Sequence, residues 1–145
     1  MIGEKGRQPA LLVLEDGSLY RGRAFAGKGE EVAAITEAAM RGESVLGILP
    51  TGTGKSVCYQ VPALSRYDRT GALTVVISPL VALMADQVAG LEARGITTCA
   101  SVNGMLSMPE RADVLDRVRL GDIAILIISP EQLRNRSVRR VLAQR

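Results

Sequence analysis

Four short runs of aliphatic residues do most to limit what this chain can fold into. The last of them, IAILIIS, is an unbroken aliphatic stretch closed by a single serine. The four runs lie at 44–50, 72–78, 96–102 and 123–129. Segments with helical periodicity separate them, at 55–66, 79–95 and 108–121. Strands without polar alternation are covered on both faces, so we expect an α/β fold with a parallel sheet sandwiched by helices.

Two more helices are expected outside this core, at 30–42, where Gly42 ends the first, and at 130–144. Pro62 is expected to bend or end the helix at 55–66, because proline has no backbone N–H to donate. Ser107 and Glu110 have the spacing of a capping box, which predicts that the helix at 108–121 begins there.

Two of the strands end in the same way. VVISPL at 75–80 and LIISPE at 126–131 each place a serine and a proline before a helix. Serine is a preferred N-cap and proline a preferred first helical residue. Parallel strands would bring both helix N-termini to the carboxyl edge of the sheet, where free N–H groups and helix dipoles favour anions.

The N-terminal segment has a different character. ALLVLEDGSLYRGRAFA at 10–26 contains two apolar runs around an Asp16-Gly17 turn signal, which predicts a β-hairpin. GKG at 27–29 is typical of a linker. We therefore predict a hairpin extension over residues 1–29 and an α/β domain over residues 30–145.

Composition excludes several kinds of site. The chain has no histidine, which rules out imidazole bases and histidine-containing metal sites. Cys58 and Cys99 lie far apart and outside any CxxC pattern, so a reduced, cytoplasmic setting is expected. There is no signal peptide and no apolar run of membrane length, so no membrane partner is expected. From Pro130 onward five arginines face one glutamate, which predicts either a phosphate-binding surface or a solvated face.

A glycine loop follows the first strand and precedes a helix, which is the context of a Walker A phosphate-binding loop. Its glycines let backbone N–H groups turn toward phosphates, Lys55 would reach the β- and γ-phosphates of ATP, and Ser56 would offer its hydroxyl to Mg²⁺. Leu49 stands where the full motif has its first glycine. The predicted cofactor-binding residues are Thr51, Gly52, Thr53, Gly54, Lys55 and Ser56.

Three segments together resemble RecQ-type DNA helicases of superfamily 2. GILPTGTGKSVCYQVPAL resembles their motif I, VVISPLVALMADQV their motif Ia, and ILIISPEQL the motif that follows. The resemblance covers residues 42–142, part of the first RecA-like lobe. It implies ATP-driven strand separation, with Lys55 and Ser56 as catalytic residues and with both Ser-Pro segments touching one strand. Adding the basic helix, the predicted nucleic-acid residues are Ser78, Pro79, Ser129, Arg136, Arg139 and Arg140.

The chain also departs from that family. The acidic Walker B box and the second lobe would follow Arg145, so we expect the chain to be inactive alone, and a partner chain or second lobe to be missing. No glutamine lies between Pro9 and Thr51, where the family reads adenine. Ala82 stands where the family usually has serine. Asp86, two turns into a helix, and Asp122, at the amino end of a strand, are not expected to complete a metal site.

Residues 10–29 resemble the start of the small chain of carbamoyl-phosphate synthase, without its glutaminase residues. The chain thus looks like a splice of segments from two unrelated families, with a natural truncation, a gene fusion and an engineered chimera all left open. Three functions stay open: an ATP-binding helicase fragment with weak, sequence-independent binding to single-stranded DNA, a small P-loop kinase, and a non-catalytic assembly module with a vestigial P-loop.

Overall fold

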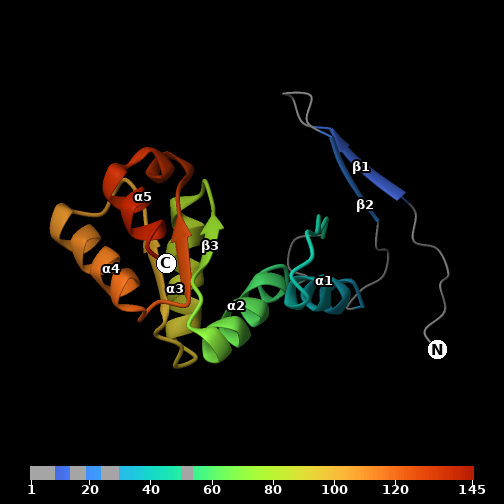
Figure 1. Cartoon of the computed structure of the whole chain (residues 1–145), viewed down its shortest axis with the longest axis horizontal. Helices are drawn as coiled ribbons and strands as arrows, with labels where there is room; N and C mark the ends of the chain where they lie inside the picture. Colours follow the sequence, from blue (N-terminus) through green and yellow to red (C-terminus); the bar gives the residue numbers. More distant parts are fainter. Residues whose placement is uncertain (1–8, 14–18, 24–29, 50–53) are drawn as a thin grey trace. The chain divides into compact units, whose positions relative to one another are not determined.

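The structure is a computed structural model of the chain, and it describes residues 9–13, 19–23, 30–49 and 54–145. The chain divides into two compact units, Met1–Pro62 and Ala63–Arg145. Figure 1 traces the elements in sequence order.

The first unit contains the predicted hairpin. Strands β1 (Pro9–Val13) and β2 (Leu19–Arg23) pair antiparallel, with Val13 opposite Leu19. The Asp16-Gly17 turn and the linker at 27–29 lie outside the described residues, as does the predicted boundary between residues 29 and 30. That boundary therefore stays a prediction.

Helix α1 (Glu30–Met40) ends as expected, with Gly42 at a φ of +77°. Helix α2 (Val57–Thr70) passes through Pro62 and continues to Thr70, so the expectation that Pro62 could end it is wrong. The last turns of α2 are held by contacts of their own. Ala63 is buried, and the Tyr67 hydroxyl donates to the Gly121 carbonyl oxygen at 2.7 Å. These contacts offset the single backbone hydrogen bond that proline cannot make.

The strand predicted at 44–50 is wrong over its described part. Residues 43–49 form neither helix nor strand, and Ile48 is 78% exposed. A strand needs a neighbouring backbone to take its N–H and C=O groups. None of the described strands pairs with this run, so its apolar pattern alone does not make it a strand.

The second unit holds a three-stranded parallel sheet in the order β3-β5-β4. The strands are β3 (Thr74–Ile77), β4 (Cys99–Val102) and β5 (Ile125–Ile128). Ile125 is the common partner of Thr74 and Cys99, so the three strands run in register. All four residues of β5 are buried, as the aliphatic run at 123–129 predicts.

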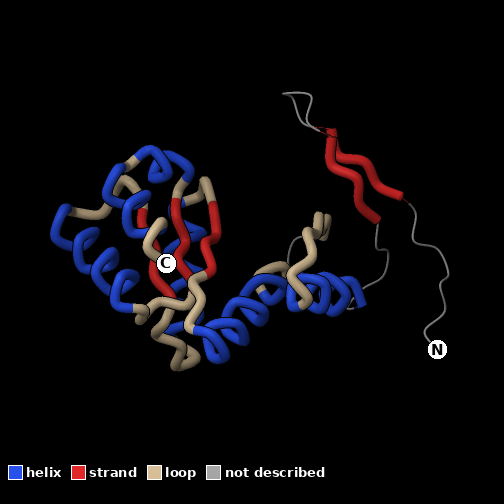
Figure 2. The backbone as a smooth tube through the Cα atoms, in the orientation of Figure 1, coloured by secondary structure: helices blue, strands red, loops and turns tan. Residues whose placement is uncertain are grey.

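Helices cover both faces of this sheet. Helix α3 (Val81–Glu92) links β3 to β4, and helix α4 (Met108–Leu120) returns from β4 to β5. Right-handed crossovers in opposite directions place these two helices on opposite faces. The core on the α4 face contains Leu115 and Val118 of α4 with Leu126 and Ile128 of β5. Figure 2 shows the sheet between its helices.

The final helix differs from the prediction. Residues 130–144 form a 3₁₀ turn, η1 (Pro130–Arg134), and a separate helix α5 (Arg136–Leu142). Asn135 interrupts them with extended backbone angles, and its Oδ1 accepts hydrogen bonds from the N–H groups of Ser137 at 2.9 Å and Val138 at 3.4 Å. Asparagine thus starts a new helix instead of continuing the old one.

The capping box at α4 is confirmed. The Ser107 hydroxyl accepts from the Glu110 N–H, and the Glu110 carboxylate accepts from the Ser107 N–H at 2.8 Å. The predicted α/β class with a small parallel sheet flanked by helices is also confirmed, as an incomplete RecA-like sheet. No helix in the described part of the chain is long and apolar enough to cross a membrane.

Candidate functional site

The described part of the glycine loop has the backbone that phosphate binding requires. Gly54 has a φ of +87°, in the left-handed region that favours glycine. A Cβ added to Gly54 would meet no atom within 4 Å among the described residues. The described residues therefore leave space beside the backbone at this position. Thr51, Gly52 and Thr53 lie outside the described residues.

Helix α2 begins directly after Ser56. The Val57 N–H donates to the Gly54 carbonyl at 3.0 Å and the Cys58 N–H to the Lys55 carbonyl at 3.1 Å. The N–H groups of Lys55 and Ser56 donate to no residue that the structure describes. Unused N–H groups at the positive end of a helix attract anions. The Lys55 side chain is exposed beside them, and Ser56 is half-buried.

Helix α1 supports the segments on both sides of the loop. The backbone at Gly47 passes so close to Ile35 that an added Cβ would lie 2.8 Å from its Cδ1 atom. On the other side, the Cys58 thiol lies 3.9 Å from the Val32 carbonyl oxygen and donates to it. Leu49, which replaces the motif's first glycine, is buried. The aliphatic residue thus serves packing.

A second group of predicted residues lies at the carboxyl edge of the sheet in the other unit. The Ser78 N–H donates to the Ile128 carbonyl at 3.0 Å, and the Ser129 N–H donates to the Val102 carbonyl at 3.2 Å. These hydrogen bonds extend the β3–β5 and β4–β5 pairings by one residue. Ser78 and Ser129 therefore lie together at this edge, as the Ser-Pro pattern predicts.

The predicted role of Ser78 as a helix cap is wrong. The N-cap of α3 is Leu80, which has no side chain able to cap, and α3 begins at Val81. The Ser78 hydroxyl accepts from the Leu80 N–H at 3.4 Å. Pro79 is exposed and precedes the helix instead of starting it. The Ser-Pro step thus forms a turn before α3.

Ser129 does occupy an N-cap position, but of the short 3₁₀ turn η1. It is 1% exposed, and its hydroxyl donates to the Glu131 carboxylate. That hydrogen bond lowers the pKa of Glu131, so the carboxylate is charged at neutral pH. A phosphate approaching Ser129 would meet this negative charge, which weakens the prediction of an anion site there.

Sequence reasoning missed two residues beside this edge. Asn103 follows β4 as Ser78 follows β3, and it is buried with its Oδ1 accepting from the Met105 N–H at 2.8 Å. Arg111 of α4 donates through Nη2 to the Asn103 carbonyl at 3.3 Å. The sequence signal that could have identified Asn103 is its position directly after a strand, because a polar residue follows each of the three strands.

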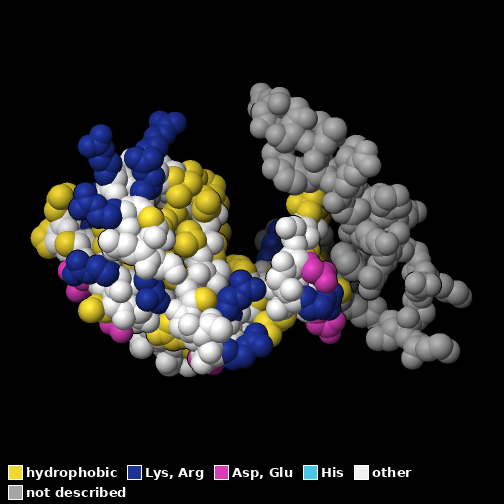
Figure 3. Space-filling view, in the orientation of Figure 1, with side chains coloured by type: hydrophobic (Ala, Val, Ile, Leu, Met, Phe, Trp, Pro, Cys, Tyr) yellow, Lys and Arg dark blue, Asp and Glu magenta, His cyan; other side chains and the backbone are white. Residues whose placement is uncertain are grey.

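The three predicted arginines lie on α5 and are exposed. None of them forms a hydrogen bond or ion pair with the residues that the structure describes. Figure 3 shows basic side chains over the part of the surface formed by α4 and α5, and those on these two helices are arginines. The arginines are Arg136, Arg139 and Arg140.

Carboxylates do not converge on any point in the described ranges. No group of three or more Asp, Glu, Cys or His residues there could hold a metal ion. Asp86 and Asp122 are both exposed.

The chain matches known proteins over most of its length. The model of the DEAD/DEAH box helicase family matches residues 31–144. The ATP-dependent DNA helicase Q4 of Mus musculus is 44% identical over 94 residues, which are 65% of this chain and 8% of that protein. The ATP-dependent DNA helicase RecQ of Haemophilus influenzae is 39% identical over 76% of this chain, and that of Bacillus subtilis is 40% identical over 80%.

The matched region is a small part of each relative. The chain spans 17% of the Haemophilus protein and 18% of the Bacillus protein. The family match includes the glycine loop, the sheet and α5, while residues 1–30 lie outside it. The chain therefore belongs to the DEAD/DEAH box helicase family, and these relatives are helicases of the RecQ type.

Proposed function

We propose that this chain binds the phosphates of ATP with residues 51–56, as part of a RecQ-type ATP-dependent DNA helicase. The observation that carries the proposal is the start of α2. There Gly54, Lys55 and Ser56 combine a left-handed glycine, an exposed ammonium group and backbone N–H groups that donate to no residue the structure describes. The relatives' names, which include ATP and DNA, support the same nucleotide and substrate.

ATP and Mg²⁺ fit the described residues. The space beside Gly54 leaves room for phosphate oxygens, Lys55 supplies a cation, and the Ser56 hydroxyl supplies an oxygen ligand. When bound, Mg²⁺ neutralises charge on the phosphates. The chain spans less than a fifth of each relative, so strand separation is proposed only together with the parts that it does not match. Alone, we expect it to bind nucleotide weakly and to hydrolyse little or none.

A fluorescent ADP analogue tests the nucleotide site. Lys55→Ala should weaken binding by about tenfold or more, since it removes a charge that serves only the ligand. Arg66→Ala is the matched control, because Arg66 is an exposed cation on α2, the helix that Lys55 precedes. It should keep its affinity within about twofold. Equal affinity in the Lys55→Ala variant and the unmodified chain would refute the phosphate site.

We also propose weak, sequence-independent binding of single-stranded DNA through the arginines of α5. The proposed DNA surface also includes Ser78, Pro79 and Ser129, because they share the carboxyl edge of the sheet. The Glu131 carboxylate makes Ser129 the least favourable phosphate contact of these three. Each arginine that neutralises a phosphate releases a counterion. Replacing Arg136, Arg139 and Arg140 with alanine should therefore reduce the salt slope by about two units. An unchanged slope would show that these arginines form only a solvated face.

The hairpin is proposed to be separable from this function. Residues 1–30 lie outside the family match, and their resemblance to carbamoyl-phosphate synthase stays a prediction. We expect that deleting residues 1–29 leaves the thermal unfolding of residues 30–145 nearly unchanged. A large loss of stability would instead mean that the hairpin joins the sheet or covers its edge. The alternative of an assembly module with a vestigial P-loop is distinguished by nucleotide binding, which it lacks.

A further inference from the structure

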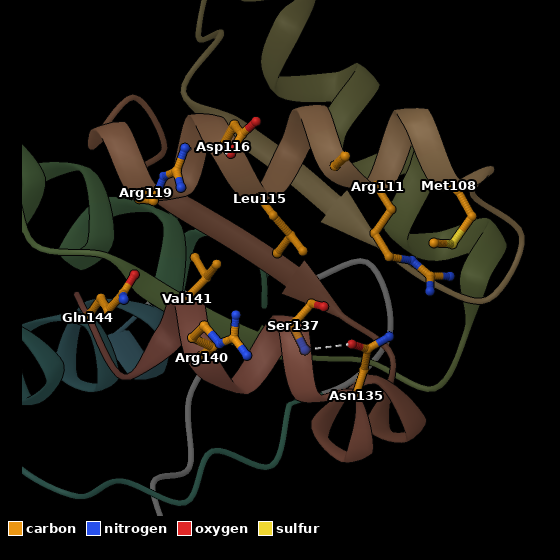
Figure 4. Close-up of a pocket in the computed structure, with 11 residues that line it drawn as sticks. Met108, Arg111, Leu115, Asp116, Arg119, Asn135, Ser137, Arg140, Val141 and Gln144 are labelled. Carbon is orange, nitrogen blue, oxygen red and sulfur yellow. Dashed lines mark hydrogen bonds and ion pairs between the residues drawn. The ribbon is translucent and has the colours of Figure 1, made fainter.

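Helices α4 and α5 leave a groove between them on one face of the sheet. The groove has a volume of about 530 Å³, within the range of binding cavities. Figure 4 shows Leu115 of α4 and Val141 of α5 pointing toward one another at its floor. Ala112 and Met108 extend the apolar lining along α4. Met108 is 77% exposed, so the groove is open at that end.

The rim of the groove is basic. It includes the guanidinium groups of Arg111, Arg119 and Arg140, against the single carboxylate of Asp116. Asp116 pairs with Arg119 at 3.0 Å. This pair leaves the charges of the other two arginines without a carboxylate partner in the described part of the chain.

These two arginines differ in their surroundings. Arg111 donates through Nη2 to the Asn103 carbonyl, and its Nε is buried without a partner among the described residues. Arg140 makes no hydrogen bond to any of those residues. The groove therefore combines an apolar floor with positive charge that no carboxylate of the described residues neutralises. An acidic, partly apolar ligand would satisfy both.

We propose that this groove binds an acidic amphipathic helix of a partner protein. Six residues of α4 line it with the three- and four-residue spacing of one helix face, from Met108 to Arg119. That stretch is about 16 Å long, or three helical turns. A docked helix would cover Leu115 and Val141 with its apolar side chains and pair its carboxylates with Arg140. Met108 adapts to different apolar surfaces because its side chain is unbranched.

Nucleic acid fits this groove less well. A phosphate backbone has no apolar surface to cover Leu115 and Val141, and Asp116 repels it. The groove also lies between the helices that cover a sheet face. Of the proposed nucleic-acid contacts, Ser78 and Ser129 lie at the carboxyl edge of the sheet, and Arg136 and Arg139 do not line the groove. Arg140 is shared by the groove and the proposed nucleic-acid surface. The helix-binding groove thus goes beyond the proposed helicase function and shares only Arg140 with it.

The test uses the whole chain and a fluorescein-labelled peptide of about twelve residues, with leucines on one helical face and glutamates beside them. Binding is followed by fluorescence anisotropy at about 0.15 M salt, where distant charges are screened. Arg140→Glu should weaken binding by about tenfold or more. Arg139→Glu is the matched control, since Arg139 carries the same charge on the same helix but does not line the groove. It should change affinity by no more than about twofold.

Two more measurements complete the design. Met108→Ser should weaken peptide binding without changing the circular dichroism spectrum, because Met108 is exposed. A peptide with lysines in place of the glutamates should not bind. Equal weakening by both arginine reversals, or no binding of the acidic peptide, would overturn the proposal. So would an oligo-dT strand that displaces the peptide and loses affinity only in Arg140→Glu, since it would assign the groove to nucleic acid.

Discussion

Two glycines with the same left-handed backbone conformation allow a direct test of the phosphate loop. Gly54 and Gly95 have φ values of +87° and +81°, and an added Cβ at either would meet no atom within 4 Å in the described parts of the chain. Gly54 precedes α2 in the proposed site, while Gly95 follows α3 in the other unit. Alanine at either position therefore meets strain in its own backbone but no atom of the described residues.

The cost of that strain follows from the φ angles. An L-residue in the left-handed region costs about 1–2 kcal/mol, so both variants should lose stability by this amount. For a domain of about 60–100 residues, each kcal/mol lowers the unfolding midpoint by roughly 4–8 °C. At Gly54 the Cβ would also enter the space proposed for phosphate oxygens. We therefore expect Gly54→Ala to weaken nucleotide binding by about tenfold, or 1.4 kcal/mol, at a temperature where the chain is folded.

Thermal unfolding by circular dichroism and anisotropy of a fluorescent ADP analogue give the two quantities separately. Gly95→Ala should reproduce the loss of stability and leave nucleotide affinity unchanged. If both variants bind nucleotide as the unmodified chain does, the loop does not hold phosphates. If both lose affinity equally, the effect is one of stability, and the reasoning from the space beside Gly54 is refuted.

Two further predictions concern residues outside the loop. Ser107→Ala should cost about 1 kcal/mol of stability in urea unfolding, because it removes the N-cap of α4. The hydrogen bonds from Ser107 lower the pKa of Glu110, and their contribution is present at neutral pH and lost as the pH falls below the ordinary value of 4.5. An NMR titration should therefore find a higher pKa for Glu110 in that variant, and an unchanged value would contradict the capping box. Burial raises the pKa of the Cys99 thiol to about 11, so iodoacetamide at about pH 8 should modify the half-buried Cys58 first and Cys99 only on unfolding. Equal rates in the folded chain, measured by mass spectrometry, would show that Cys99 is accessible.

The sequence predicted those elements whose causes are local. The start of α4 follows from Ser107 and Glu110, which bond to each other within one turn. Strand β5 follows from an aliphatic run that only a doubly covered strand can bury. The prediction of one helix over 130–144 was wrong because helical propensity does not show where the chain must turn. Asn135 takes extended angles there and caps a second helix.

The positions of the candidate site residues in the fold could be predicted from the sequence only where their causes are local. Lys55 and Ser56 stand at the start of a helix because the glycine loop sets that position. The cap role of Ser78 failed because Ser-Pro also suits a turn, and only the backbone shows that α3 begins at Val81. The groove beside Arg140 could not be predicted, since it depends on how α4 and α5 pack. Sequence shows the charge of α5 but not which of its arginines face α4.

The exposed apolar residues of β3 and of the run at 43–49 give a physical reason for the weak nucleotide affinity that we propose for the chain alone. At one edge of the sheet, β4 is buried at Cys99 and Val102, while at the other edge β3 leaves Ile77 54% exposed. The run at 43–49 is likewise aliphatic and unpaired within the described residues. A phosphate loop is held most firmly when a strand fixes its first residue and a helix its last. Among the described residues, the glycine loop is supported by α2 and by the packing of α1 on Gly47. The start of α2 should therefore contribute most of the affinity for nucleotide. That is the physical reason to expect weak binding by the chain alone.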